Sequence, residues 1–323
     1  QLPVKARGTA AALITGAMMW VVPSSAQTPG QLAEACTVAS GAARFCTGAA
    51  VGARAIQSQV GLLAGTGVEI PGTATTLGTR VGGGPRLAFS LRAGLVDMSF
   101  PDLSAQLSDP LVTREAGAIA TAVHGRASAG FFDGFQLMPT VGGFLSLDVF
   151  GQASLLFVPE DEELTGGSRS YSAGVRIGVL REGFTVPGIS VSVAKRFPED
   201  VSYLADGDVI EVEPGVISYR AVLGKDLFAI EWLAGVGYDE YDGNVTLDVV
   251  DSGAVGSRVT ISAPLGSDRL MYFGGASTTL GIVLTLSIEA GWAEGFEALP
   301  GWDGPHDPTS RTLFGGLAAR LTL

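Results

Sequence analysis

The sequence has no run of apolar residues long enough to form a membrane-spanning helix. After residue 26, no stretch reaches the roughly 18 unbroken apolar residues that such a helix needs. Yet 46% of the 323 residues are hydrophobic and the mean hydropathy is +0.35, which is apolar for a soluble protein. Apolar residues dispersed through short alternating segments would account for both observations.

Positive charge is also scarce. Lysine and arginine total 20, against 32 aspartates and glutamates, so the formal net charge is −12. Because binding to phosphates requires a basic surface, this balance argues against a nucleic acid as a partner. Glycine, by contrast, is abundant at 46 residues, which suits tight turns and disfavours long helices.

Cysteine and histidine are rare, with two residues of each type. Cys36 and Cys46 are predicted to form a structural disulfide, since export to an oxidising compartment favours one. Ten positions apart on one straight helix, they would lie on different faces, so the bridge requires a break, and Gly41 lies between them. Neither their spacing nor a nearby histidine supports a metal or redox pair.

Residues 1–26 have the pattern of a secretory signal peptide. Lys5 and Arg7 form a basic start, residues 9–22 form an apolar core, and Ser24-Ser25-Ala26 forms a small-residue cleavage site. The alternative is an N-terminal membrane anchor, for which the apolar core is too short. We therefore expect this segment to be removed before Gln27.

From residue 85 onward, apolar and polar residues alternate. Ile282, Leu284, Leu286 and Ile288 share one face of an extended strand, and the residues between them face the other way. Ten such strands are predicted, at 85–98, 115–130, 143–158, 169–181, 187–198, 209–223, 227–240, 267–279, 281–295 and 311–323. Short connections alternate with long polar ones, the longest being 241–266. At these lengths, tilted strands cross a bilayer.

The leader, the alternation and the unequal connections resemble those of bacterial outer-membrane β-barrel proteins, over residues 85–323. The ending Ala319-Arg320-Leu321-Thr322-Leu323 resembles the assembly signal of that family, although the family's signal usually ends in an aromatic residue. The resemblance implies a closed antiparallel transmembrane β-barrel of about ten strands, with eight to twelve allowed, in the bacterial outer membrane. It also implies lipid, lipopolysaccharide and the barrel-assembly machinery as partners. No motif of a specific family is present.

Residues 27–84 form a separate N-terminal segment. Residues 31–63 are rich in alanine and glutamine and are predicted to form one or two short helices, followed by a glycine-rich linker. A helical segment before a barrel resembles the layout of the fatty-acid transporter family, in which it plugs the lumen. We expect it either to cap the periplasmic mouth or to plug the barrel.

Strand parity predicts which charged side chains face the lumen. A charge that faces lipid at mid-bilayer costs about 2–4 kcal/mol, so charges belong on the face opposite the apolar set. The predicted lumen residues are Arg86, Arg92, His124, Arg126, Asp148, Arg176, Arg196, Arg220, Glu231, Glu289 and Arg320. Their excess of arginine favours either an arginine–carboxylate network that fills a narrow lumen or a pore lining that prefers anions.

The predicted function is passive or gated transport of a small solute through this arginine-rich lumen. The alternative is a structural or adhesive surface barrel with a closed lumen. A weaker alternative is a hydrolase at the outer rim, with His306 beside Asp307 and an acidic pair, Asp239 and Asp242, on another rim segment. Neither a Gly-x-Ser-x-Gly elbow nor a phosphate-binding loop is present, so we predict no enzyme, no cofactor and no metal.

Overall fold

The computed structural model describes residues 27–66, 73–79, 84–103, 114–136, 142–158, 164–167, 169–205, 208–250, 257–281 and 283–323. The predicted signal peptide, residues 1–26, lies outside these ranges. No helix within the described ranges is long and apolar enough to cross a membrane.

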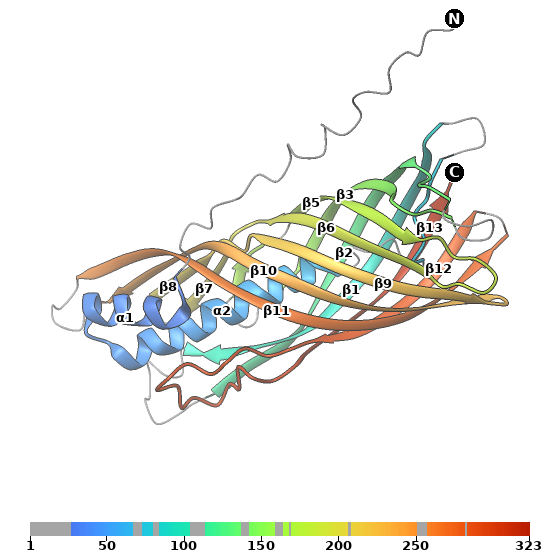
Figure 1. Cartoon of the computed structure of the whole chain (residues 1–323). Coiled ribbons are helices and arrows are strands. Elements are labelled where there is room, and N and C mark those ends of the chain that lie inside the picture. Colours follow the sequence, from blue (N-terminus) through green and yellow to red (C-terminus); the bar gives the residue numbers. More distant parts are fainter. Residues whose placement is uncertain are drawn as a thin grey trace, which may run out of the picture.

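Ten antiparallel strands close into a barrel (Figure 1). They are β1 (Arg86–Asp102), β2 (Arg114–Phe132), β3 (Ser146–Phe157), β5 (Arg169–Leu180), β6 (Gly188–Pro198), β9 (Val216–Leu227), β10 (Ile230–Val250), β11 (Arg258–Leu280), β12 (Leu284–Ala293) and β13 (Thr312–Thr322). The first barrel strand, β1, pairs with both β2 and the last strand, β13, and β10 pairs with β11. The predicted closed barrel of ten strands is confirmed.

The barrel exposes a belt of apolar side chains on its outer surface. Leu91, Ile119, Leu155, Ile288 and Leu317 come from five different strands and are each more than half exposed to the surroundings. Exposed aromatic rings lie at both edges of this belt, at Phe131, Phe184 and Phe228 and at Phe157, Tyr171 and Phe197. An apolar band between aromatic girdles, on an even number of antiparallel strands, is the exterior of a bacterial outer-membrane barrel. The chain is such a protein and lies in the bacterial outer membrane.

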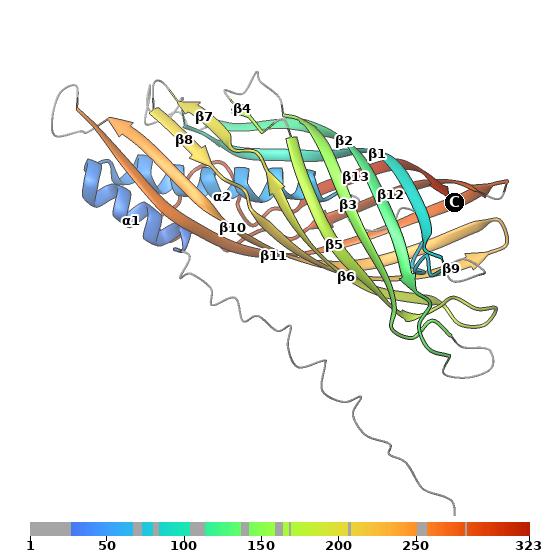
Figure 2. The same ribbon diagram turned by 90° about the horizontal axis from the view of Figure 1, so that it is seen from above.

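The two ends of the barrel differ. At the end near the C-terminus, short turns join β9 to β10 and β11 to β12. At the opposite end, which we call the loop end, β10 and β11 extend well beyond the other strands (Figures 1 and 2). Outer-membrane barrels have short periplasmic turns and longer external loops, so the loop end faces outward.

The loop end contains more strand than was predicted. The strands β4 (Leu164–Gly166), β7 (Val201–Ala205) and β8 (Asp208–Val212) add a sheet extension next to β10. Consequently the predicted strand 209–223 divides into β8 and β9, and most of the predicted loop 241–266 belongs to β10 and β11. Val245 and Leu247 explain the difference, because both are fully buried on the inner face of this extension.

Two helices precede the barrel. Helix α1 (Pro29–Ser40) begins with a capping box formed by Thr28 and Gln31, and it ends at Gly41, whose φ of 74° suits glycine. Helix α2 (Ala43–Gly65) follows at once. The predicted disulfide is confirmed: Cys36 and Cys46 are bonded across this break, with their Cα atoms 5.5 Å apart.

Helix α2 lies inside the barrel, and α1 lies at the loop end (Figures 1 and 2). Every residue from Gly48 to Gly65 is buried. The helix packs against β1, β2, β6, β8 and β10, so it contacts the wall on several sides. Helix α2, which we call the plug, thus occupies the loop-end half of the lumen, whereas segment 73–79 reaches the short-turn end, where the backbone nitrogen of Thr79 donates to Asp133 at 2.9 Å.

Candidate functional site

A buried ion cluster lies where α2 meets the barrel wall. Asp239 accepts hydrogen bonds from Arg196 at 3.0 Å and from Arg220 at 2.7 and 3.1 Å, and all three side chains are almost completely buried. Ser218 also donates to Asp239. Arg196 in turn donates to the carbonyl of Gly61 in α2. A carboxylate between two guanidinium groups therefore connects the wall of the barrel to its plug.

A second ion pair joins neighbouring parts of the wall. Arg92 on β1 lies 2.9 Å from Glu289 on β12, and both side chains are at least nine-tenths buried. Burying either charge alone would cost several kcal/mol, at roughly the level found for unpaired ions in proteins, so each requires the other.

His124, on β2, contacts the chain at the C-terminal end of α2. Its Nε2 atom is 3.1 Å from Thr66 Oγ1, and its Nδ1 atom is 2.7 Å from Ser154 Oγ. The ring is 1% exposed. Because both nitrogens have hydroxyl partners, this histidine acts as a fixed link between the plug and β3.

Four of the predicted lumen residues hold segment 73–79, which continues below α2. Asp148 accepts from the backbone nitrogen of Leu77 at 2.9 and 3.1 Å, and Arg86 donates to the Leu77 carbonyl at 3.3 Å. Arg176 donates to the Thr73 carbonyl at 2.7 Å, and Glu231 accepts from the Ala74 nitrogen at 3.2 Å. Of these, Arg86 is exposed at the short-turn mouth.

The remaining two predicted lumen residues, Arg126 and Arg320, form hydrogen bonds with side chains of the wall. Arg126 donates to Ser128 at 3.2 Å and lies 3.7 Å from the centre of the Phe150 ring. Arg320 donates to Thr285 at 3.2 Å. The structure therefore brings the predicted residues together around the plug, most of them in contact with it or with one another.

Asp239 and Arg269 belong to the barrel interior but are absent from the predicted set. Asp239 is separated from Glu231 by an even number of residues on one strand, so the parity that turns Glu231 inward also turns Asp239 inward. Arg269 shares its parity with the buried Met271 and Phe273. The signal was present, but both residues lie close to predicted strand ends, where acidic rim residues such as Asp242 are frequent.

Polar side chains also tether the upper part of α2. Gln59 exchanges two hydrogen bonds with the backbone of Ser99 on β1, at 2.5 and 2.7 Å. Gln57 donates to the Leu265 carbonyl at 3.0 Å, and Gln152 donates to the Ala64 carbonyl at 3.3 Å. Within the described ranges, no backbone–backbone hydrogen bond joins α2 to a strand. Helix α2 is therefore held in the lumen by side chains, whereas Gln27, just before α1, exchanges backbone hydrogen bonds with Pro264 and Gly266 of β11.

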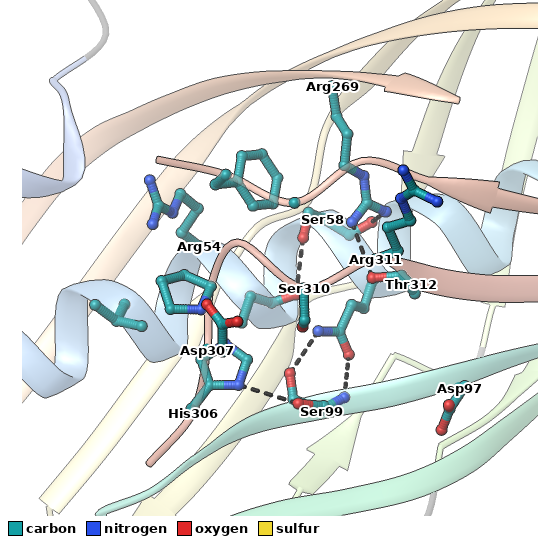
Figure 3. A pocket seen from close by; sticks show the side chains of 16 residues that line it. Arg54, Ser58, Asp97, Ser99, Arg269, His306, Asp307, Ser310, Arg311 and Thr312 are labelled. Atoms are coloured by element: carbon teal, nitrogen blue, oxygen red, sulfur yellow. Dashed lines mark hydrogen bonds between the residues drawn. The ribbon is translucent and has the colours of Figure 1, made fainter. Parts of the chain in front are cut away.

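The geometry at His306 differs from that of the predicted rim hydrolase. His306 Nδ1 lies 3.0 Å from Ser99 Oγ (Figure 3) and 3.1 Å from Glu115 Oε1. Burial lowers the pKa of His306, although its contact with Glu115 acts in the opposite direction. Asp307 instead accepts hydrogen bonds from Thr309, which lower its pKa. Asp239, the other predicted rim acid, is engaged by two arginines inside the lumen.

The described residues contain no group of three or more histidines, cysteines or carboxylates that could hold a metal ion. No protein-family model matches the sequence, and no curated protein matches it either.

Several solved structures are similar to this chain. The translocator domain of the autotransporter NalP from Neisseria meningitidis has 11% identity and a TM-score of 0.39, with 74% of this chain and 86% of that chain covered. The outer-membrane protease OmpT from Escherichia coli has 7% identity and a TM-score of 0.39, covering 74% and 96%. The Pseudomonas putida toluene transporter TodX has 10% identity and a TM-score of 0.30, covering 78% and 95%. These similarities are distant, so function must be argued from the barrel itself.

Proposed function

We propose that this outer-membrane barrel is a gated transporter for a small solute and that α2 is its gate. One observation carries the proposal: α2 fills the loop-end half of the lumen, yet in the described residues only side chains join this helix to the wall. The sheet hydrogen bonds that hold the barrel together would therefore stay intact if α2 moved. A gate needs such a separable element with two positions.

The lining of the lumen supports passage of a polar solute. Arg92, Arg196, Arg220, Asp239 and Glu289 all point inward at membrane level. With α2 displaced, these charged groups would face water instead of an apolar surface, so the opened lumen would fill with water. The excess of arginine over carboxylate would favour anions over cations.

The hydrogen bonds of Gln57 and Gln59 to the wall contribute to the free-energy difference between the closed and the open barrel. A hydrogen bond contributes about 0.5–1.5 kcal/mol net, so removal of the Gln57 and Gln59 side chains weakens closure by about 2 kcal/mol. That energy corresponds to a roughly thirtyfold rise in the ratio of open to closed barrels.

Ion conductance in planar bilayers tests the proposal. The double variant Gln57→Ala/Gln59→Ala is expected to open far more often than the unaltered protein. Thr47→Ala is the matched control, because Thr47 lies near the start of α2 and its hydroxyl donates to the Ala43 carbonyl within the helix, with no wall partner among the described residues. A double variant that folds into the membrane but conducts no more than the control would contradict the role of α2 as a gate.

A structural barrel with a closed lumen is the second candidate. It is favoured by the complete burial of residues 48–65 and by the close fit of Gly61, where a Cβ atom would come within 2.7 Å of Tyr241 and Val216. If the barrel is structural, the unaltered protein, the double variant and the control variant should all show no ion conductance in the same bilayers.

A further inference from the structure

The loop end contains a polar cavity of about 150 Å³, which we call the loop-end cavity. It lies between α2, β1, β11 and the segment 294–311. Figure 3 shows the side chains that line it, which include Arg54, Arg269 and Arg311. At about 30 Å³ for each water molecule in the liquid, the volume is that of roughly five waters. It is therefore of the right size for a small ion rather than a large ligand.

Arg269 is buried in the wall of this cavity and forms no ion pair with a carboxylate of the described residues. Its side chain is 3% exposed. One terminal nitrogen donates to Thr312 Oγ1 at 3.2 Å, the other lies 3.5 Å from the Ser58 carbonyl, and Nε has no hydrogen-bond partner among the described residues. A buried guanidinium ordinarily requires a counter-charge.

Arg54, on the α2 side of the cavity, is likewise a buried arginine without an ion pair among the described residues. It is 6% exposed and donates to the backbone carbonyl of Glu297 at 2.9 Å. Burial lowers its pKa, while the charge of Glu297 partly restores it. The guanidinium groups of Arg54 and Arg269 lie 4.9 and 5.4 Å from the centre of the Phe296 ring, which packs against both. Neither arginine forms an ion pair with a carboxylate of the described chain.

Most acidic groups near the cavity are exposed or engaged elsewhere. Asp239 lies opposite Arg269 in the register of β10 and β11 but accepts from Arg196 and Arg220, and Glu297 is exposed. Asp307 accepts from Thr309, and Glu115 is in contact with Ser99 and His306. Asp97 borders the cavity, but its side chain is exposed and lies apart from the other labelled residues in Figure 3. Arg311, which is exposed, adds a third positive charge at the edge. The interior of the cavity is therefore positive.

We propose that the loop-end cavity binds a small oxyanion, with a carboxylate or phosphate group seated on Arg269. The fork of a guanidinium matches the oxygens of either group, and the unpartnered Nε is a free donor for it. Arg54 and Arg311 supply the surrounding positive potential. The ion is a free solute and not a lipid phosphate, because Arg269 points into the barrel interior and away from the lipid surface. Binding at this site needs no movement of α2, so the inference goes beyond the transport proposal.

Calorimetric titration of the full chain in non-ionic, lipopolysaccharide-free micelles tests the site. Sodium phosphate and sodium succinate are added at constant ionic strength, with sodium chloride as the reference ion. We expect saturable binding of at least one oxyanion and none of chloride. Arg269→Gln is expected to weaken binding by about tenfold or more, since a charge-assisted hydrogen bond is lost.

Arg311→Gln keeps the test valid if loss of Arg269 disturbs folding. The side chain is exposed, so the variant is expected to fold and to bind a few times more weakly. Arg258→Gln is the matched control, because Arg258 lies on the outer face of the loop end in an ion pair of 3.0 Å with Asp248. The unaltered affinity is expected there.

Three results would overturn the proposal. They are the absence of saturable oxyanion binding, an equal loss of binding in the Arg258 and Arg269 variants, and binding of added lipopolysaccharide without binding of the free ions. Conductance is not measured in this experiment, so a silent barrel that binds phosphate would remove the transport proposal and leave this one intact.

Discussion

The two halves of the barrel have opposite polarity along the same strands. At membrane level, β10 turns Trp232 and Val236 outward and Asp239 inward. Nearer the loop end, the same strand turns Val245 and Leu247 inward and exposes Asn244. Strand parity is constant, so only the identity of the residues has changed. The outer solvent is lipid for the first half and water for the second.

The reversal determines what surrounds α2. On β1, Arg92 faces the lumen at membrane level, whereas Val96 and Met98 are buried further along. The loop-end half is therefore an ordinary apolar core built around α1 and α2, and the membrane half is a network of paired charges. Arg54 and Arg269 are the exception: Arg269 lies where the two halves meet, opposite Asp239 in the β10–β11 register, and neither arginine forms an ion pair with a carboxylate of the described residues.

The largest expected effect comes from breaking the charge network. Asp239→Ala leaves Arg196 and Arg220 buried without their shared carboxylate, which should cost about 3–5 kcal/mol. Urea unfolding in phospholipid vesicles, followed by tryptophan fluorescence, measures the loss. Asp242→Ala is the control, because this nearby aspartate is exposed and should change stability by less than about 0.5 kcal/mol. Equal losses would show that the network does not stabilise the barrel.

The second prediction concerns the fit of the plug between the two halves. A Cβ atom on Gly61 would lie 2.7 Å from Tyr241 and from Val216, so Gly61→Ala should destabilise the barrel by about 1–3 kcal/mol. On the same helix, a Cβ atom on Gly52 would meet nothing closer than 3.5 Å. Gly52→Ala should therefore be neutral or slightly stabilising, since alanine favours helix. The same unfolding assay compares them, and a similar loss in both would mean that α2 is not closely packed at Gly61.

The membrane half could be predicted from sequence because lipid imposes a strict rule. An outward residue such as Ile288 must be apolar, and an inward one such as Glu289 can then be identified by counting in twos. Which charges pair could not be predicted. Arg196 forms an ion pair with Asp239 because of the register of the strands and because α2 occupies the lumen beside them. The sequence of a single strand contains neither piece of information.

The strands of the loop-end half were predicted as a loop for a related reason. Residues 241–266 alternate as regularly as the other strands, but their outward residues, such as Asp242 and Asn244, are typical of polar loops. The inward-facing side chains of Val245 and Leu247 are buried only because α1 and α2 pack beside them, and a single strand does not reveal that packing. The division between β8 and β9 could have been predicted from the sequence. Pro214 and Gly215 interrupt the predicted strand 209–223, and the proline nitrogen cannot donate a hydrogen bond to a sheet.

The smallest expected effect is a pH dependence confined to the loop-end half. His306 is buried beside Ser99 and Glu115, and burial lowers its pKa below the ordinary value of 6.5; Arg54 acts in the same direction, whereas Glu115 and Asp307 oppose it. The unfolded chain therefore takes up a proton at higher pH than the folded one, so stability falls as pH drops below about 6.5. Free energies of unfolding measured between about pH 8 and pH 5 should decline less steeply for His306→Gln than for the unaltered protein. Parallel curves would mean that the folded barrel protonates His306 as readily as water-exposed chain does, and that this corner of the apolar half is open to solvent.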